Sequence, residues 1–485
     1  MAKKNVLLLV ADDLGRQLGC YGDSTCKTPN LDRLAAEGVK FTKAFASTAS
    51  CSGSRSTIYT GLHTHQNGQY GLESGRNHFQ THDHIQTAPA ILSKLGYLTG
   101  IVGKVHVGPA AVYPWEVREE SDTRDVAFVA DRTAALFQRA GSEGKPFFLT
   151  VGFIDPHRDR TRAGFGNENF DRFEEVKYKP EDIHVPEYLL DSPGTRTELT
   201  SYYESISRLD HGVGLILSNL QDSGLGDDTL VIFVSDNGPP FINSKTTLYD
   251  AGVNLPLIVR SPASTSSVIN PNFISYVDIL PTILDYVGDK SEDASGRPGR
   301  SFLSILSESK ELSDWDHVYG SHTFHEVTNY WPTRYLRNRR FKYHRNIAHR
   351  LDFPFAADIY GSLAWEDVRN QKNNPKVIGH RQVVDYFYRP PEELYDIVAD
   401  PYEVRNLALD PTYAETLKEM RDRLEEWQQK TIDPWLYRDG VSVKFIQHHL
   451  DAGLKIPDRW DLDATAPESF GPDIKHYESK GFGGI

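Results

Sequence analysis

The chain has 485 residues, of which 39% are hydrophobic and 25% are charged. This balance is typical of a globular protein, and the length favours one large domain with a smaller one. The formal net charge of -14 argues against a general nucleic-acid or anionic-membrane binder, because both need a positive surface. It does not exclude an anionic substrate, since a local cluster of cations can oppose the overall sign.

Cysteine usage and apolar runs narrow the class further. The only cysteines are Cys20, Cys26 and Cys51, an odd and low number that argues against a disulfide scaffold. No apolar run reaches the roughly 18 residues of a transmembrane helix, and the first one is too short for a signal peptide. The chain also has no N-glycosylation sequon. These features predict a cytoplasmic protein without a membrane partner, and they leave open whether it forms a homo-oligomer.

The first two thirds of the chain alternate between strand and helix patterns. Short apolar runs predict buried parallel strands at Val6–Val10, Gly100–Val102, Phe147–Phe153, Leu230–Val234 and Leu257–Val259. Helical patterns lie between them at Leu31–Glu37, Pro89–Leu95 and Glu198–Leu220. This alternation predicts an α/β fold with a large, doubly wound, mostly parallel sheet that is covered by helices on both faces.

The pattern changes near Ser309–Trp315. Later segments have the alternation of an antiparallel sheet or the period of an amphipathic helix, and they lie at Trp331–Leu336, Phe341–His344 and Ala414–Lys430. We therefore predict a catalytic domain over 1–312 and a smaller C-terminal α+β domain over 313–485. The tail from Asp461 is expected to be irregular.

Polar residues follow directly after four of the predicted strands. In chain order they are Asp12, Asp13, Lys104, His106, Asp155, His157, Asp236 and Asn237. Open α/β sheets bind ligands at the carboxyl ends of their strands, so these side chains are expected to converge on one site.

Two of these pairs, Asp12 with Asp13 and Asp236 with Asn237, consist of oxygen donors. Hard cations prefer such ligands, whereas Zn²⁺ prefers His and Cys. Either pair alone is explained equally well as an ordinary turn. Together, each at the end of an apolar strand, they predict one metal ion, with Ca²⁺ as the first choice and Mg²⁺ or Mn²⁺ as alternatives.

The stretch from Cys51 to Gly61 predicts a short helix that stops at the glycine. Cys51 then lies at the helix N-terminus, where the backbone dipole lowers the pKa of a thiol. Arg55 follows one turn later and can reach the same place. Taken alone, such a cysteine is more often a buried structural thiol.

This stretch resembles the signature of the sulfatase family, Cys-x-Pro-x-Arg followed by Thr-Gly. The matching residues are Cys51, Arg55, Thr60 and Gly61. Further family elements occur in family order at Asp12-Asp13, Thr28–Asp32, Gly103–His106, Asp155–His157 and Ser235–Gly238. Within the family the chain most resembles the heparan N-sulfatases, or sulfamidases, at His65–Gly68, His106–Pro109, His325–Thr328, Glu393–Asp396 and Asp433–Trp435.

The resemblance implies an alkaline-phosphatase-like fold and a role for each matching residue. Asp12, Asp13, Asp236 and Asn237 hold Ca²⁺, and Cys51 is the position normally oxidised to formylglycine, whose hydrate is the nucleophile. Arg55 stabilises that group, and His106 is its general base. Sulfate oxygens are bound by Lys104, His157 and Lys245. The loops around His65, His325 and Glu326 form the pocket for a terminal sugar.

Two residues depart from the family pattern. Gly53 stands where the family has the proline that the modifying enzyme reads, so the sequence leaves open whether Cys51 becomes formylglycine or acts as a thiolate. We expect at least part of the active protein to carry an unmodified Cys51. Lys245 stands where the sulfamidases have arginine. Lysine keeps the positive charge but lacks the guanidinium group that binds an anion through two parallel hydrogen bonds.

The resulting expectation is metal-dependent hydrolysis of a sulfate ester or a sulfamate, with an N-sulfoglucosamine-like sugar as substrate. One alternative is a phosphonate monoester or phosphodiester hydrolase, because a scaffold alone does not determine the substrate. Another is a catalytically inactive carbohydrate-binding homologue. It is disfavoured because every proposed catalytic position carries a chemically competent residue.

Overall fold

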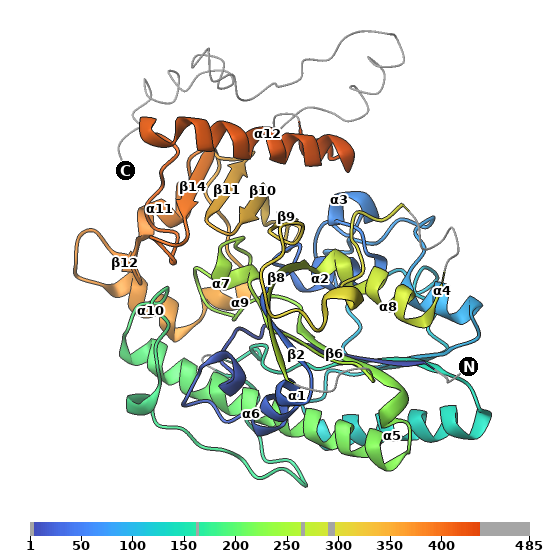
Figure 1. The fold of residues 1–485 in the computed structure, drawn as a ribbon. Helices are drawn as coiled ribbons and strands as arrows, with labels where there is room; N and C mark the ends of the chain where they lie inside the picture. The colour runs from blue at the N-terminus through green and yellow to red at the C-terminus, as the bar shows by residue number, and fades with distance from the viewer. Residues whose placement is uncertain (1–3, 162–163, 263–266, 290–295, 437–485) are drawn as a thin grey trace, which may run out of the picture.

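The computed structural model describes residues 4–161, 164–262, 267–289 and 296–436 (Figure 1). Its centre is an eight-stranded sheet in the order β4-β3-β5-β1-β6-β7-β2-β8. The strands are β1 (Asn5–Ala11), β2 (Val39–Phe45), β3 (Leu98–Gly103), β4 (Val117–Glu120), β5 (Phe147–Gly152), β6 (Thr229–Ser235), β7 (Leu257–Arg260) and β8 (Val268–Ser275).

All five predicted strands of this sheet are present, but the direction predicted for β7 was wrong. β1 pairs in parallel with both β5 and β6, whereas β7 is antiparallel to both of its neighbours, β6 and β2. After β6 the chain stays at the carboxyl edge of the sheet, where it forms the loop that carries Asn237 and Lys245. The next strand therefore starts from that edge and runs back.

Three strands of the large sheet have no counterpart among the sequence predictions. β4 lies at the sheet edge, and β2 alternates buried and half-buried residues, including Lys40 and Lys43. β8 contains Pro271, and its register with β2 shifts between Phe41 and Lys43. Proline removes a ladder hydrogen bond and is confined to edges and bulges, so a strand that contains it has a weak sequence signal.

Helices cover both faces of the large sheet, which confirms the doubly wound prediction (Figure 1). One face packs against α1 (Pro29–Ala36), α5 (Val126–Glu143) and α6 (Pro193–Asp222). The other face packs against α2 (Cys51–Thr60), α4 (Ala88–Lys94) and α8 (Ile279–Val287). Side chains of β1 alternate between the two cores, with Leu7 and Leu9 in one and Val6 and Leu8 in the other.

A second, four-stranded sheet has the order β14-β11-β10-β9 and is antiparallel, as predicted. It consists of β9 (His317–Phe324), β10 (Tyr330–Asn338), β11 (Phe341–Asn346) and β14 (Glu392–Asp396). The helix α12 (Ala414–Lys430) covers one face through Leu417, Met420 and Leu424 (Figure 1). The other face meets the large sheet in a small core that includes Phe45, Phe273 and Tyr335.

Shorter elements complete the fold. They are the helices α3 (Thr64–Asn67), α7 (Asp250–Val253), α9 (Ala357–Tyr360), α10 (Leu363–Asn370) and α11 (Val383–Phe387), and the two-stranded sheet of β12 (Val377–Ile378) and β13 (Arg381–Gln382). No helix in the described part of the chain combines the length and the apolar character that a membrane crossing requires. The predicted tail from Asp461 lies outside the described residues. The division at 312/313 stays a proposal.

Candidate active site

The loop that follows β1 is held by the core of the large sheet. Asp13 adopts a positive φ of 60°, a conformation that non-glycine residues rarely take without support. The hydroxyl of Tyr202 donates to the carbonyl oxygen of Asp13 at 2.9 Å, and the Leu14 amide donates to Ser235 Oγ at 2.8 Å. These buried bonds hold Asp12 and Asp13 at the carboxyl end of β1.

Helix α2 begins at Cys51 and ends before Gly61, whose φ of 64° is left-handed, so the predicted helix is confirmed. Its hydroxyl groups bond to the helix backbone, for example from Ser56 Oγ to the Gly53 carbonyl at 2.7 Å. Every residue of the helix is buried, including Cys51 at its first position. The cysteine sulfur lies 3.9 Å from Asp13 Oδ1.

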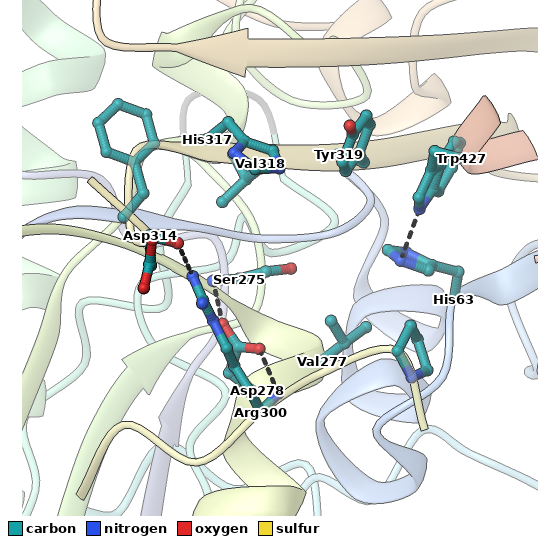
Figure 2. A pocket seen from close by; sticks show the side chains of 12 residues that line it. His63, Ser275, Val277, Asp278, Arg300, Asp314, His317, Val318, Tyr319 and Trp427 are labelled. Carbon is teal, nitrogen blue, oxygen red and sulfur yellow. Dashed lines mark hydrogen bonds between the residues drawn. The ribbon is translucent and has the colours of Figure 1, made fainter. Parts of the chain in front are cut away.

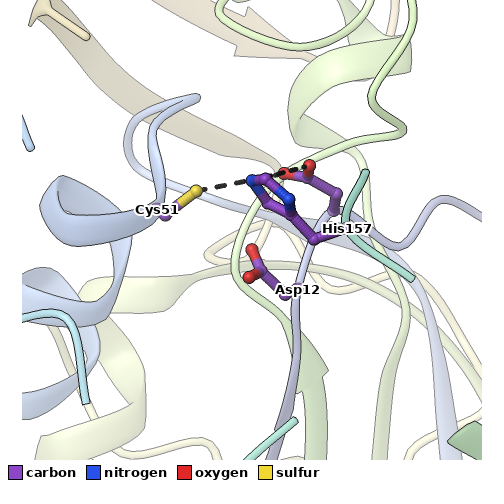
Figure 3. Close-up of side chains that lie close together, drawn as sticks. Asp12, Cys51 and His157 are labelled. Carbon is purple, nitrogen blue, oxygen red and sulfur yellow. Dashed lines mark hydrogen bonds and ion pairs between the residues drawn. The ribbon is translucent and has the colours of Figure 1, made fainter. Parts of the chain in front are cut away.

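Four of the converging side chains form one compact group. Asp12, Asp13, Cys51 and His157 each offer one ligand atom, and these atoms lie within 4.8 Å of one another. Figure 3 shows Cys51, Asp12 and His157 turned toward a common point from different elements.

The predicted metal ligands Asp236 and Asn237 join this group through hydrogen bonds. Asp236 Oδ1 accepts from the Asp13 amide at 3.1 Å, and Asn237 Nδ2 donates to Asp13 Oδ1 at 2.6 Å. The structure therefore brings all four predicted metal ligands together.

The donor set suits a hard divalent cation. Asp12 Oδ1 and Asn237 Oδ1 are buried and have no hydrogen-bond partner among the described residues. A buried acceptor without a partner costs about 1–3 kcal/mol, and a cation bound to the oxygens removes that cost. Burial and the neighbouring Asp12 also raise the pKa of Asp236, with Arg55 opposing them. A positive ion among three buried carboxylates relieves this repulsion.

Three cationic or neutral nitrogen donors surround the carboxylates. Lys104 Nζ donates to Asp12 Oδ2, and Lys245 Nζ donates to Asp13 Oδ2 at 2.8 Å. Lys245 Nζ also lies 3.2 Å from Nε2 of His157. The backbone at His157 is held in turn by Arg124, which donates to its carbonyl oxygen at 2.9 Å. This arrangement can bind the oxygens of a tetrahedral anion.

Arg55 and His106 occupy the edges of the group. Arg55 Nε donates to Asp236 Oδ2 at 2.8 Å, while its Nη2 is buried and has no partner among the described residues. His106 Nε2 lies 3.2 Å from Ser74 Oγ, and its Nδ1 is likewise buried without a partner there. Burial, and next the charge of Lys104, lower the pKa of His106 well below its usual range. A neutral imidazole can accept a proton, as a general base must.

The pKa of the Cys51 thiol is raised rather than lowered as the helix N-terminus predicted. Burial raises this pKa well above its usual range; Lys104 opposes the shift, and Asp12, Asp236 and Asp13 add to it. The helix N-terminus predicted from the sequence is present, but complete burial among carboxylates outweighs its dipole.

The C-terminal half of the chain contributes a separate wall to the site. His325 is buried, and its Nδ1 lies 3.0 Å from Oγ of Ser50, the residue before Cys51. Glu326 is half-buried; burial and then Asp358 raise its pKa, while Lys245 opposes them. The structure thus places His325 beside the start of α2, and Glu326 where it feels the charges of Asp358 and Lys245.

Sequence reasoning missed Asp358. This residue lies in α9, and its Oδ2 accepts a hydrogen bond from Lys245 Nζ at 2.6 Å. No motif or apolar strand precedes it, so the sequence has no signal for its position. Burial alone would raise the pKa of Asp358. The charges of Lys245 and His157 lower it by more, so the pKa lies below its usual range.

His65 is the predicted site residue that the structure does not bring to this group. Its Nε2 lies 2.8 Å from Thr431 Oγ1, and its ring packs edge-on against Trp427 of α12. Burial lowers the pKa of His65 to about 4. Its surroundings are those of a neutral core histidine beneath α12.

A separate cavity of about 320 Å³ lies near this histidine (Figure 2). It is lined by His63, Asp278, Arg300, Tyr319 and Trp427, among others. Its lining includes none of the predicted site residues among those that the structure describes, so it is not the reaction centre.

Comparisons with known proteins identify the family of this chain. The sequence model of the family described as Sulfatase matches residues 4–289. The chain is 38% identical over 470 residues to N-sulphoglucosamine sulphohydrolase of Homo sapiens, covering 90% of this chain and 92% of the relative.

Solved structures share the fold. A protein in complex with its substrate D-glucosamine-2-N,6-O-disulfate is similar with a TM-score of 0.65 and 21% identity, over 89% of this chain and 99% of that one. The phosphonate monoester hydrolase of Agrobacterium radiobacter is similar with a TM-score of 0.65 and 20% identity, over 88% of this chain and 96% of that one. The fold and family predicted from the sequence are confirmed: the chain belongs to the sulfatase family and is an enzyme of the sulfatase type.

Proposed function

We propose that the enzyme hydrolyses the S–N bond of an N-sulfated glucosamine. The observation that carries this proposal is the 38% identity to N-sulphoglucosamine sulphohydrolase over about nine tenths of both chains. The acidic wall of Glu326 and Asp358 supports it, because an amino sugar offers N–H and O–H donors to carboxylates.

We further propose that Asp12, Asp13, Asp236 and Asn237 hold one Ca²⁺. The support is the all-oxygen donor set and the two buried oxygens, on Asp12 and Asn237, that lack a partner among the described residues. When bound, the ion supplies Lewis-acid stabilisation of negative charge on sulfate oxygens. Mg²⁺ and Mn²⁺ are the alternatives that a metal titration distinguishes.

The nucleophile is proposed at position 51. Burial raises the pKa of the Cys51 thiol, and this shift disfavours the thiolate that an unmodified cysteine nucleophile needs. We therefore propose that the active enzyme carries formylglycine there, which supplies a hydrated aldehyde as nucleophile. Nη2 of Arg55, which has no hydrogen-bond partner among the described residues, is the donor available to hold that group.

The remaining roles follow from the charges in the site. Lys104, His157 and Lys245 bind the sulfate oxygens, and this binding favours the charge that builds up during sulfuryl transfer. His106 accepts the proton of the nucleophile in this proposal, since its buried Nδ1 has no hydrogen-bond partner among the described residues. Glu326 accepts hydrogen bonds from sugar hydroxyls.

A substrate panel tests this function. Purified enzyme is assayed on N-sulfoglucosamine, glucosamine 6-O-sulfate, a phosphate diester and a phosphonate monoester, each after chelation and after readdition of Ca²⁺. Turnover of N-sulfoglucosamine that exceeds the others and depends on the metal is expected. A preference for the 6-O-sulfate rejects the sulfamidase proposal, and metal-independent turnover rejects the metal site.

Mass spectrometry of the peptide that contains Cys51 tests the nucleophile separately. Active enzyme is expected to carry the aldehyde at this position. Full activity with only unmodified cysteine contradicts the formylglycine proposal and restores the thiolate. A phosphonate monoester hydrolase remains the second candidate function, because an enzyme of that activity shares the fold over 88% of this chain; the same panel decides between the two.

A further inference from the structure

Asp358 reaches the reaction centre from outside the large sheet. Its short helix, α9, comes between β11 and β14 in the order of the chain. Asp358 Oδ2 accepts from Lys245 Nζ at 2.6 Å and lies 3.9 Å from Nε2 of His157. Both contacts are to side chains assigned to the sulfate oxygens. A carboxylate therefore stands beside the cations that face the substrate.

The carboxylate of Asp358 retains capacity for another donor. Its Oδ1 has no hydrogen-bond partner among the described residues. The side chain nevertheless keeps 22% of its surface exposed, and that of His157 keeps 26%, so both border the opening of the site. Because rotation of an aspartate carboxylate about its last bond is broad, either oxygen can turn toward a ligand.

The chemistry of the substrate limits what this carboxylate can face. Sulfate oxygens carry negative charge and repel it, so its partner must be a hydrogen-bond donor on the leaving group. In a sulfamate the atom that bridges to sulfur is a nitrogen with a hydrogen, one bond away from the group that Lys245 and His157 bind. In a sulfate ester the bridging oxygen has no hydrogen and presents only lone pairs.

We propose that Asp358 is a specificity-determining residue that accepts a hydrogen bond from the bridging N–H and thereby selects sulfamates over sulfate esters. Lys245 holds the carboxylate in place for this contact. A site built to accept a substrate hydrogen bond discriminates strongly against an analogue that lacks the donor, because the carboxylate is then left facing lone pairs. The inference rests on the proposed sulfamidase activity.

The test uses two substrates that differ only at the bridging atom, N-sulfoglucosamine and glucose 2-O-sulfate. Asp358→Ala removes the acceptor and the ion pair with Lys245, whereas Asp358→Asn removes the ion pair but keeps an acceptor oxygen. Asp352→Ala, an exposed residue of the same segment, is the matched control. Thermal melting of each variant checks the fold, and Asp358→Asn serves alone if the alanine variant does not fold.

We expect Asp358→Ala to lower kcat/KM for N-sulfoglucosamine at least ~10-fold more than for glucose 2-O-sulfate, a difference that corresponds to one hydrogen bond to a charged group. Asp358→Asn should recover part of that difference, and Asp352→Ala should leave both values unchanged. Inhibition by the products gives a second readout without turnover. Wild type should bind glucosamine more tightly than glucose, and Asp358→Ala should not.

Equal losses on both substrates overturn the inference, since they show that Asp358 only positions Lys245. Unchanged kinetics in Asp358→Ala overturn it as well. Wild-type enzyme that hydrolyses glucose 2-O-sulfate but not N-sulfoglucosamine rejects the proposed function itself, and the inference with it. The kcat/KM values of wild type on the two substrates therefore test the proposed function. The changes in these values in the variants test the role of Asp358.

Discussion

The active site joins two regions of different construction, a floor and a wall. The floor, formed by Asp12, Asp13, Cys51 and Asp236, lies at the ends of β1, α2 and β6 and is entirely buried. The wall, formed by His325, Glu326 and Asp358, comes from segments of the small-sheet region, and its two acids are only half-buried. Reaction machinery on rigid elements and recognition on loops from a second layer can change independently.

The two regions also differ in how tightly their side chains are bonded. Asp13 contacts the amide of Asn237, the ammonium of Lys245 and the sulfur of Cys51. Glu326 makes its described hydrogen bond through the backbone, to Asn329. Substitutions in the floor should therefore abolish turnover of every substrate, whereas substitutions in the wall should change the choice of substrate.

The largest effect is expected for Asp13→Asn. The change keeps the shape of the side chain but removes one negative charge from the proposed metal ligands. Charge stabilisation by a bound metal is worth several kcal/mol, so kcat/KM should fall by about 10³-fold or more on every substrate. Steady-state kinetics and calorimetric titration with Ca²⁺ measure the two losses.

The control is Asp278→Asn, a buried aspartate that lines the separate cavity and is not among the proposed metal ligands. It should keep turnover and Ca²⁺ affinity. Near-normal activity of Asp13→Asn would contradict the metal assignment, provided that its far-ultraviolet circular dichroism matches wild type.

Lys245 joins floor and wall, since its ammonium contacts both Asp13 and Asp358. Lys245→Met should lower kcat by about 10²–10³-fold on sulfate esters and sulfamates alike, as for the loss of one donor to developing negative charge. Lys245→Arg keeps the charge and should retain activity within about 10-fold of wild type. Equal loss in both variants would mean that packing, rather than charge, is what Lys245 supplies.

The floor could be predicted from the sequence, whereas the wall residue Asp358 could not. Asp12, Lys104 and Asp236 each follow an apolar strand, and strand ends of a parallel sheet meet at one edge whatever the rest of the chain does. Asp358 lies in a four-residue helix whose position depends on how the small sheet docks. That docking is a long-range property without a local pattern.

The misjudged details have the same origin. The direction of β7 depends on the path of the preceding loop over the active site, and its apolar run is the same for either direction. β8 was not predicted as a strand because it contains Pro271. The pKa of the Cys51 thiol depends first on burial and then on charged groups from distant parts of the chain, whereas the helix N-terminus that suggested a low pKa is a local feature.

A smaller effect is expected for Glu326→Gln in the wall. Loss of a charged acceptor for sugar hydroxyls should raise KM for N-sulfoglucosamine by about 5–10-fold, which corresponds to roughly 1 kcal/mol. The compact substrate 4-nitrophenyl sulfate has no sugar hydroxyls, so its KM should not change. Equal changes in KM on both substrates would mean that Glu326 acts in the reaction itself. They would contradict the proposed difference in role between floor and wall.

The smallest effect on activity is expected for His65→Gln, because the structure places this residue beneath α12 rather than in the wall. Glutamine can still bond to Thr431, so KM should stay within about 2-fold of wild type.

The pH dependence of stability should reveal the change at His65 instead. Burial lowers the pKa of His65 to about 4, whereas an unfolded histidine has a pKa of about 6.5. Between these values the unfolded chain binds a proton that the folded protein does not, so His65 destabilises the fold increasingly as pH falls through this window. The wild-type loss of unfolding free energy from pH 7.5 to pH 5 should therefore shrink by about 2 kcal/mol in His65→Gln. Urea titrations at both pH values measure this difference, with the exposed His84→Gln as control. A raised KM with unchanged acid sensitivity would return His65 to the substrate pocket.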